Sequence, residues 1–444
     1  MPKASAKKKS DAFPPDPALS ALVDITEATL PNGLKVRLWP NHDAPVMSLY
    51  IFFNVGSRNE RPGITGISHL FEHMMFNGSK KYGPKMFDLT LESNGGRSNA
   101  YTTTDMTVYY EDFAAEALET VLDLESDRMR ALSINDKSLA SEREVVKEER
   151  RSRVDNDITG IMDEELGTLV WKAHPYRWPV IGWMGDIDNI TRPDCEQYFR
   201  TYYAPNNATL YLTGDFEPKA ALALLKKYFG NIKKGPALPP VVNSEPDQIG
   251  ERRAVVEYPA QSPSLLIGYR APVATDPDTQ VLDVIQYALS VGEGSRLTKA
   301  LVYGKELATS VGIDWTWRID PGLVMFHAEL KPDSKPAEVE AVIYAELEKL
   351  AKDGLTDREL QKVKNNLRAH QLRELSTNSG RANAIGNYET LLGDWRALLS
   401  LPARYDAITN EQVKAAAKKY FTATRRSVVT VKPLPIEQSA EAQQ

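Results

Sequence analysis

The pattern of hydrophobic and polar positions divides the chain into strands and helices that alternate. The first half is predicted to contain strands at 34–39 and 46–55, a helix from about Gly66, strands over roughly 99–111, helices over about 114–170 and a strand near 208–213. The second half repeats this style, with a strand at 264–270, a helix at about 278–291, strands near 309–330 and long helices after them. This order predicts an α+β fold with two similar, duplicated domains, each a mostly antiparallel sheet packed against helices.

The ends of the two halves resemble one another at a constant spacing. A helix opens at Ile190 and is followed by an apolar strand at 209–212, and a second helix opens at Ile408 and is followed by a strand at 427–430. The two helix starts are 218 residues apart (408 − 190 = 218), and the tyrosines near the helix ends keep the same offset. A fixed offset that crosses a helix–strand boundary indicates an internal duplication.

A proline-rich stretch without a hydrophobic period separates the two halves and is typical of a linker. The chain begins with a segment that carries four lysines among its first nine residues. We therefore divide the chain into a flexible basic tail at 1–20, a first domain at 21–234, a linker at 235–250, a homologous second domain at 251–434 and a tail at 435–444.

Composition and charge exclude several classes of protein. With 42% hydrophobic and 26% charged residues among 444, the chain is neither disordered nor a coiled coil. Its net charge of −6, without a lysine- or arginine-dense helix, predicts no nucleic-acid partner. No run approaches the roughly 18 apolar residues of a membrane span. We expect a soluble protein, cytoplasmic on the chain as given and periplasmic if a leader peptide was removed.

The chain has a single cysteine, Cys195, which excludes an internal disulfide. Nothing nearby in the sequence would activate the thiol as a nucleophile. We therefore expect Cys195 at an ordinary position on the surface of a helix.

The segment His69-Leu70-Phe71-Glu72-His73 carries the main functional signal. Residues four apart lie on one face of a helix, so His69 and His73 can present two imidazoles to one metal ion, with Glu72 beside them. Apolar residues at 67, 70, 71, 74 and 75 form a core-facing stripe, which leaves the histidines and the glutamate on the other face. A solvated helix face is the alternative explanation. A catalytic zinc ion usually has three protein ligands, so a third must come from elsewhere.

The acidic segment 141–151 contains the candidates for that third ligand. Glu142, Val145, Val146 and Glu149 follow the spacing i, i+3, i+4 and i+7, which predicts that both carboxylates share the inward stripe of the two valines. A buried carboxylate needs a partner or a metal ion. Glu142 and Glu149 are therefore the candidates for a ligand and for a residue that supports a ligand.

With these residues assembled, the chain resembles the pitrilysin/insulysin-type zinc metallopeptidases, whose motif is the inverted His-x-x-Glu-His. Its two-domain length is most similar to the branch that contains mitochondrial processing peptidase. In that family the third ligand is a glutamate 76 residues after the second histidine, which falls on Glu149 (73 + 76 = 149), and a further acidic residue falls on Glu142. The resemblance covers about residues 24–434, including His174–Tyr176 and Tyr203–Asn207.

The resemblance implies a zinc-dependent endopeptidase that hydrolyses peptides or unfolded polypeptides through a metal-activated water. One Zn²⁺ per chain would be held by His69, His73 and Glu149, and Glu72 would take the proton as the water attacks a peptide carbonyl. In similar enzymes the peptide adds as a strand to a sheet edge. This edge falls on Asn99, Ala100, Tyr101 and Thr102. A strand that pairs only within its own sheet is the alternative for this segment.

The second half departs from the family pattern. Many relatives carry an arginine and a tyrosine, seven residues apart, after a Ser-Arg-Leu signature, and this pair helps to hold the substrate. The signature is present at Ser295–Leu297, but the two expected positions fall on Val302 and Thr309. The adjacent Tyr303 is a poor substitute because a shift of one residue turns a helical side chain by about 100°.

This departure leads to an expectation about partners. We expect the chain to be the catalytic subunit of a heterodimer, with a zinc-binding catalytic domain at 21–234 and a domain without metal at 251–434. A related metal-free subunit would supply the Arg/Tyr pair, and a homodimer is the less favoured arrangement.

A non-catalytic core or scaffold subunit of a larger complex is the alternative function, since members of this family serve in respiratory complexes. The complete set of His69, Glu72, His73 and Glu149 favours the enzyme. A scaffold has no physical need for three aligned ligands and a base.

Overall fold

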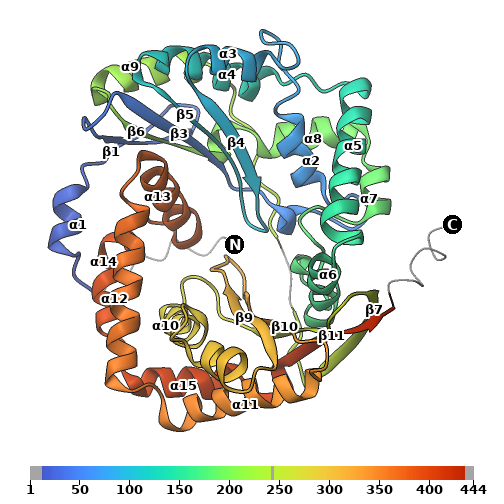
Figure 1. Cartoon of the computed structure of the whole chain (residues 1–444). Helices are drawn as coiled ribbons and strands as arrows, with labels where there is room; N and C mark the ends of the chain where they lie inside the picture. The colour runs from blue at the N-terminus through green and yellow to red at the C-terminus, as the bar shows by residue number, and fades with distance from the viewer. Residues whose placement is uncertain (1–12, 242–244, 436–444) are drawn as a thin grey trace, which may run out of the picture.

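The computed structural model describes residues 13–241 and 245–435, which form two halves that each contain one mixed sheet (Figure 1). In the first half the strands lie in the order β1 (Thr26–Thr29), β2 (Lys35–Pro40), β6 (Ala208–Gly214), β3 (Val46–Phe53), β5 (Thr107–Ala114) and β4 (Arg97–Thr102). Only β2 and β6 are parallel neighbours, and the other pairs are antiparallel. The strand β4 is therefore an edge of this sheet.

The second sheet repeats the arrangement of the first. Its order is β7 (Arg252–Pro259), β11 (Arg426–Leu434), β8 (Ser264–Arg270), β10 (Leu323–Leu330) and β9 (Ala308–Trp315). Again one pair, β7 and β11, is parallel and the others are antiparallel. The equivalent strands β6 and β11 begin 218 residues apart (426 − 208 = 218). The predicted α+β fold with two similar, mostly antiparallel sheets is confirmed.

Helices cover both sheets and contribute apolar side chains to the cores. Those of the first half are α1 (Pro17–Leu22), α2 (Ile67–Met74), α3 (Met86–Ser93), α4 (Leu118–Ala131), α5 (Asp136–Arg150), α6 (Ile158–Val170), α7 (Met184–Asn189), α8 (Arg192–Tyr202) and α9 (Pro218–Phe229). Those of the second half are α10 (Asp278–Ser290), α11 (Pro336–Asp353), α12 (Asp357–Glu374), α13 (Asn378–Leu392), α14 (Ala397–Asp406) and α15 (Asn410–Tyr420). No helix in the described ranges combines the length and the apolar character needed to cross a bilayer.

Cys195 differs from its predicted position. The residue is fully buried in α8, where Cys195, Tyr198 and Tyr202 stand at i, i+3 and i+7 and form the inner stripe of the helix. The expectation of a surface position is therefore wrong. Burial raises the pKa of the Cys195 thiol to about 12, which keeps it protonated and unreactive.

Each half packs one of its helices on the sheet of the other half. Helix α13 of the second half packs on β3 and β6 of the first sheet, where Ile385 joins a core with Phe52 and Tyr211. Helix α6 of the first half packs on the second sheet, where Leu166 joins a core with Val429. Figure 1 shows this reciprocal arrangement, with α13 beside the upper sheet and α6 beside the lower one. Each half therefore depends on the other to bury one face of its sheet.

The first residues of the described chain also correct the predicted tail. The segment predicted as a flexible tail ends in α1, whose Leu19 is buried against the core shared by the two halves. The Asp16 backbone N–H donates to the Leu399 carbonyl at 2.8 Å, and Arg368 lies 3.0 Å from the Asp16 carboxylate. Residues 1–12 of that tail, 242–244 of the linker and 436–444 of the final tail lie outside the described residues.

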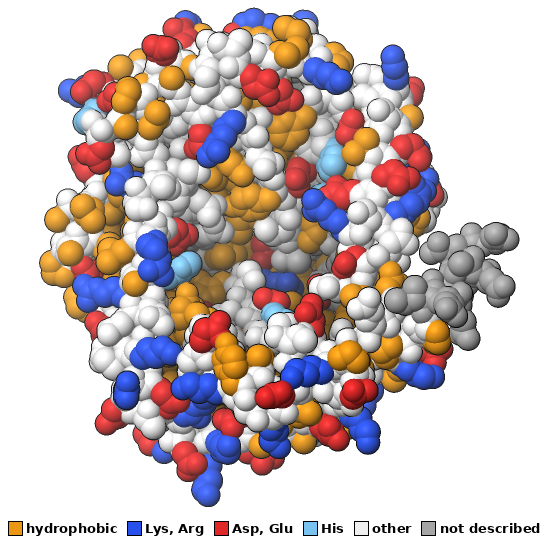
Figure 2. Space-filling view, in the orientation of Figure 1, with side chains coloured by type: hydrophobic (Ala, Val, Ile, Leu, Met, Phe, Trp, Pro, Cys, Tyr) orange, Lys and Arg blue, Asp and Glu red, His pale blue; other side chains and the backbone are white. Residues whose placement is uncertain are grey.

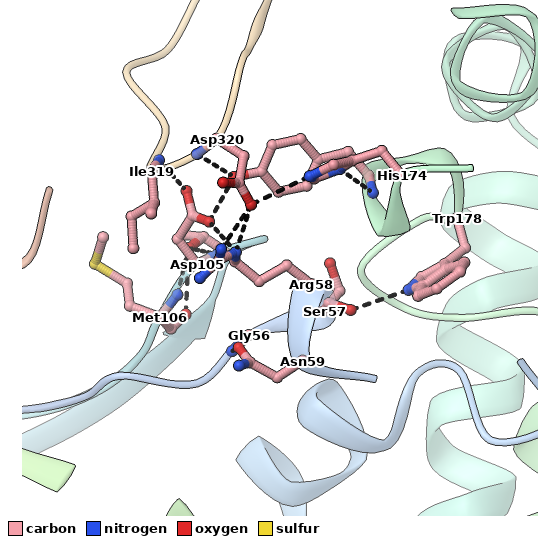
Figure 3. Close-up of polar contacts among 12 residues, drawn as sticks. Gly56, Ser57, Arg58, Asn59, Asp105, Met106, His174, Trp178, Ile319 and Asp320 are labelled. Atoms are coloured by element: carbon pink, nitrogen blue, oxygen red, sulfur yellow. Dashed lines mark hydrogen bonds and ion pairs between the residues drawn. The ribbon is translucent and has the colours of Figure 1, made fainter. Parts of the chain in front are cut away.

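A buried polar cluster joins the loop between β9 and β10 to the first half (Figure 3). Arg58 donates to the Asp320 carboxylate at 2.6 Å, and His174 Nε2 lies 3.1 Å from the same oxygen. The backbone N–H of Ile319 donates to the Asp105 carboxylate at 3.1 Å. Asp105 follows β4, so this cluster fixes the end of the edge strand against the second half. Figure 2 shows a hollow between the two halves on the face viewed.

Candidate metal centre

Helix α2 carries His69, Glu72 and His73 on the side away from the core. Its predicted inner stripe, at residues 67, 70, 71, 74 and 75, is buried to 2% exposure or less. The side chains of His69 and His73 are 11% and 22% exposed, and their ring centroids are 4.9 Å apart. The helical spacing therefore brings both imidazoles to one place, as the sequence predicts.

The start of α2 is fixed by a residue that the sequence reasoning missed. The buried Glu60 carboxylate accepts hydrogen bonds from the backbone N–H groups of Gly66 (2.9 Å) and Ser68 (2.8 Å). Gly66 has φ of 87°, and a Cβ there would lie 2.3 Å from the Ile181 carbonyl oxygen, so only glycine fits. Glu60 accepts backbone N–H groups at the start of the helix, as an N-cap residue does. It lies six residues before Gly66, outside the usual capping position, so the sequence did not indicate this role.

Helix α5 brings Glu149 to the two imidazoles. One oxygen of Glu149 lies 3.2 Å from His73 Nε2 and 3.6 Å from His69 Nε2. Ligand atoms of the three residues all lie within 4.8 Å of one another. Val146 is fully buried as predicted, but Val145 is 48% exposed, so the predicted inward stripe is wrong at that position. The inner face of α5 is narrower than the periodicity suggested.

Two further side chains hold this group in place. Glu142, on α5, lies 3.6 Å from His73 Nδ1, on the opposite side of the ring from Glu149. Arg153, in the π-helical turn Arg151–Asp155 that follows α5, forms an ion pair with the other oxygen of Glu149 at 2.9 Å. The sequence had suggested a supporting role for Glu142, whereas it gave no signal for Arg153. Together the two contacts leave one Glu149 oxygen and two Nε2 atoms facing each other.

Glu72 is held by the edge strand. Thr102 Oγ1, at the end of β4, donates to Glu72 Oε2 at 2.6 Å. Burial raises the pKa of Glu72, and the Thr102 hydrogen bond partly opposes that rise. Thr102, expected only as part of a substrate-binding edge, therefore also contacts the residue expected to act as the base.

The other residues of the predicted edge alternate between the two faces of β4. Asn99 pairs with Tyr110 of β5, and Ala100 pairs with Tyr109. The Tyr101 hydroxyl, on the face opposite Thr102, donates to Asn383 of α13 at 2.8 Å. Within the described residues β4 pairs only with β5, so its outer edge has backbone groups available for another strand.

The pKa values of the two histidines are shifted in opposite directions. Burial and the neighbouring charge of His73 lower the pKa of His69 to about 4. Burial acts in the same direction on His73, but the contacts with Glu142 and Glu149 outweigh it and raise the pKa of His73 to about 9. The contact with His73 lowers the pKa of Glu149. Two imidazoles and one ionised carboxylate form a donor set that fits a catalytic zinc ion.

The second half contains no equivalent group among the described residues. Val302 lies in the π-helical turn Thr298–Gly304, and Thr309 Oγ1 donates to the Glu329 backbone carbonyl at 3.2 Å. The Tyr303 side chain is 59% exposed, and its hydroxyl donates to Glu293. Neither expected position offers the guanidinium or phenol of the family pattern.

Fold and donor set together define a class of two-sheet α+β proteins with a His₂Glu group on two neighbouring helices. The model for insulinase (peptidase family M16) matches residues 35–182, and the model for the peptidase M16 inactive domain matches residues 189–367. A zinc protease of Helicobacter pylori, PqqE, is 32% identical over 94% of this chain and 94% of its own length. The chain belongs to the insulinase family, peptidase family M16.

Other comparisons agree with this assignment. A probable mitochondrial-processing peptidase subunit beta of Arabidopsis thaliana is 26% identical, over 88% of this chain and 75% of that protein. The crystal structure of a protease from Helicobacter pylori superposes with a TM-score of 0.90 at 32% identity, covering 93% of this chain and 100% of that one. A peptidase M16 inactive domain from Pseudomonas fluorescens shares the fold with a TM-score of 0.84 at 21% identity, covering 93% and 98%.

Proposed function

We propose that this chain is a zinc-dependent endopeptidase that hydrolyses peptides or unfolded polypeptides. The observation that carries the proposal is the convergence of His69, His73 and Glu149, whose ligand atoms lie within 4.8 Å of one another. Glu72 lies beside them on the same helix face and is neither a member of that group nor an ion-pair partner of it. This arrangement separates three metal ligands from one proton acceptor, as hydrolysis requires.

The residues of the chain have distinct roles in this reaction. Zinc, held by His69, His73 and Glu149, would supply a Lewis acid that activates a water for attack on the peptide carbonyl. Glu72 takes the proton of the attacking water with the oxygen that Thr102 does not occupy, and then delivers it to the leaving amine. Glu142 orients the His73 ring so that Nε2 faces the Glu149 carboxylate, and Arg153 contacts the other Glu149 oxygen, so both would support the residues that hold the metal.

The substrate lies as an added strand along β4. Residues Asn99, Ala100, Tyr101 and Thr102 supply backbone N–H and C=O groups on the unpaired edge of the sheet. Thr102 ends this strand and contacts Glu72, so a peptide that pairs with β4 passes next to the base. Backbone pairing selects an extended or unfolded chain rather than a particular sequence.

A heterodimer completes the site. Val302 and Thr309 stand where many relatives have an arginine and a tyrosine, and neither side chain can stabilise an oxyanion in the same way. A related metal-free subunit supplies that pair in our proposal, and a homodimer is the less favoured arrangement. The scaffold alternative requires no metal, so metal content separates the two functions.

The test measures zinc content and the hydrolysis of fluorescently labelled casein by the full chain, alone and with any subunit that co-purifies. We expect one zinc per chain, loss of activity with a chelator and recovery on adding zinc. Glu72→Gln should retain zinc and lose about 10³-fold or more in kcat, whereas His73→Ala should lose both. His42→Ala changes an exposed histidine outside the group and serves as the control. A chain that purifies without metal and hydrolyses nothing after zinc addition overturns the proposal and favours the scaffold.

A further inference from the structure

A buried arginine, Arg150, stands next to Glu149 at the end of α5. Its side chain is 5% exposed, and consecutive residues on a helix point about 100° apart, so the two side chains extend in different directions. The proposed reaction uses no atom of this arginine. A guanidinium removed from water to this degree is costly unless acceptors surround it, and those acceptors show which segments it joins.

Three acceptors from different segments surround the Arg150 guanidinium. Nη1 donates to the Gly182 backbone carbonyl at 2.7 Å and lies 2.8 Å from the Glu164 carboxylate of α6. Nη2 lies 3.2 Å from the carboxylate of Asp155, the last residue of the π-helical turn that follows α5. The planar fork of an arginine can reach all three acceptors at once, whereas the single ammonium of a lysine cannot.

The Gly182 carbonyl connects Arg150 to the helix that carries the two histidines. The Gly182 backbone lies directly against the start of α2. Its φ is 82°, and a Cβ there would lie 2.3 Å from the Thr65 carbonyl oxygen and 2.5 Å from Gly66 Cα. Gly66 is the N-cap of α2, and His69 lies in the first turn of that helix. A shift of Gly182 would therefore move the turn that holds His69.

The two carboxylates connect Arg150 to the support of Glu149. Asp155 pairs with Arg150 across the π-helical turn, and the same turn carries Arg153, whose side chain forms an ion pair with Glu149 at 2.9 Å. Glu164 holds the guanidinium from α6. Figure 1 shows α2 and α5 side by side, with α6 below α5. The imidazoles of α2 and the carboxylate of α5 therefore depend on the same buried side chain.

We propose that Arg150 is a positioning residue of the metal centre, because it sets the distance between α2, which carries the two imidazoles, and α5, which carries Glu149. This role rests on the proposed zinc-dependent function. Arg150 acts through the loop and the turn that it joins, and not by a contact with the ion. Metal affinity depends on how closely the ligands are arranged before the ion binds, so loosening these contacts weakens zinc binding.

The experiment makes the same conservative substitution at two buried arginines of the full-length chain. Arg150→Lys keeps the charge and removes the fork. Arg37→Lys does so in β2, where Arg37 is buried and pairs with Glu389 of α13. Competition with a chromogenic chelator measures zinc affinity, and urea titration measures stability. We expect both variants to lose stability, but only Arg150→Lys to bind zinc about ten-fold more weakly.

A second measurement reports the geometry of the ligands. Co²⁺ binds to the same donor sets as zinc, and its visible absorption bands depend on the arrangement of its ligands. We expect these bands to change in Arg150→Lys and to match those of wild type in Arg37→Lys. Glu164→Gln removes one acceptor of the same guanidinium from a helix that carries no ligand. It should weaken zinc binding less than Arg150→Lys does, and the two effects should not add in the double variant.

The inference is overturned if Arg150→Lys and Glu164→Gln keep the zinc affinity and the cobalt spectrum of wild type, or if Arg37→Lys loses as much affinity as Arg150→Lys. Should Arg150→Lys not fold, Glu164→Gln decides by the same two measurements. A wild-type chain that takes up no metal overturns both this role and the proposed function. Casein hydrolysis separates the two otherwise. Zinc binding that depends on Arg150 in a chain without hydrolysis would reject the peptidase and keep the positioning role, and hydrolysis with unchanged affinity would do the opposite.

Discussion

Thr102 Oγ1 lies 2.6 Å from Glu72 Oε2 and thereby joins the edge strand β4 to the helix that carries both imidazoles. The strand proposed to pair with substrate and the residue proposed as the base are thus held by one hydrogen bond. Movement of β4 when a peptide binds would be transmitted directly to the Glu72 carboxylate.

Thr102→Val tests this relationship because valine keeps the shape of threonine and removes its hydroxyl. Glu72 would lose the one side-chain donor that it has among the described residues and would sample other rotamers. We expect kcat for casein to fall about ten-fold, with a smaller change in KM, since a hydrogen bond to a charged group is worth about 1.5–3 kcal/mol. Thr104→Val, whose hydroxyl makes no hydrogen bond with the described residues, is the control. Equal kcat in the two variants would show that Thr102 does not position the base.

Glu142→Gln tests the support of His73 from behind. The neutral amide pairs less strongly with the Nδ1 side of the ring, so His73 becomes a weaker and less well-oriented ligand. We expect zinc affinity to fall by about 10- to 100-fold, as measured by competition with a chromogenic chelator. Glu144→Gln, on an exposed part of the same helix, should leave the affinity unchanged. Unchanged affinity in Glu142→Gln would remove that residue from the metal centre.

The sequence predicted those parts of the fold and of the site that depend on local spacing. The i, i+4 positions of His69 and His73 follow from short-range periodicity, as do the strands of both sheets except the edge strands β1 and β7, which were not predicted. The helical stripe alone left Glu142 and Glu149 as equal candidates for the third ligand. The assignment of Glu149 therefore depended on the spacing known from the family. Val145 is exposed although it lies on the predicted stripe, so the spacing of apolar residues does not predict how wide the buried face of the helix is.

Relationships between distant residues could not be predicted in this way. The sequences of α6 and α13 do not say on which sheet each helix packs. Arg58 and Asp320 are 262 residues apart, and each alone has the composition of an ordinary surface position. The same holds for Thr102 and Glu72, whose contact depends on where β4 ends relative to α2.

Asp320→Ala tests the polar cluster between the halves. Arg58 and His174, both largely buried, would lose their shared partner, and we expect the free energy of unfolding to fall by about 2 kcal/mol at neutral pH. The contacts with His174 and Arg58 lower the pKa of Asp320, so this contribution is present above the ordinary carboxyl pKa of about 4 and is lost as the pH falls through the lower folded value. Urea titrations should therefore give the full difference between wild type and variant at pH 7 and a smaller difference at about pH 3. Asp333→Ala, at an exposed position, is the control. A difference that stays constant down to low pH would contradict this account.

Because α13 packs on the first sheet and α6 packs on the second, we expect that neither half folds by itself. A fragment of residues 1–240 would expose the face of the first sheet that α13 covers, including Phe52 and Tyr211. We expect each fragment alone to aggregate or to bind a hydrophobic dye, and the two fragments produced together to form a stable one-to-one complex. Size-exclusion chromatography and thermal unfolding measure this. A monomeric 1–240 fragment with a cooperative transition near that of the intact chain would contradict the dependence.

Gly386→Ala tests the same contact within the intact chain. Alanine is the better helix former by about 1 kcal/mol, so propensity alone predicts stabilisation of α13. A Cβ at this position, however, would lie 2.3 Å from the Phe52 ring, which is itself fixed in the core. We therefore expect the free energy of unfolding to fall by about 1–3 kcal/mol, the usual range for overpacking. Gly185→Ala, in α7 where a Cβ would meet no atom within 4 Å, should be neutral or stabilising in the same urea titration. If both variants gain stability, α13 does not pack on β3 as closely as the structure places it.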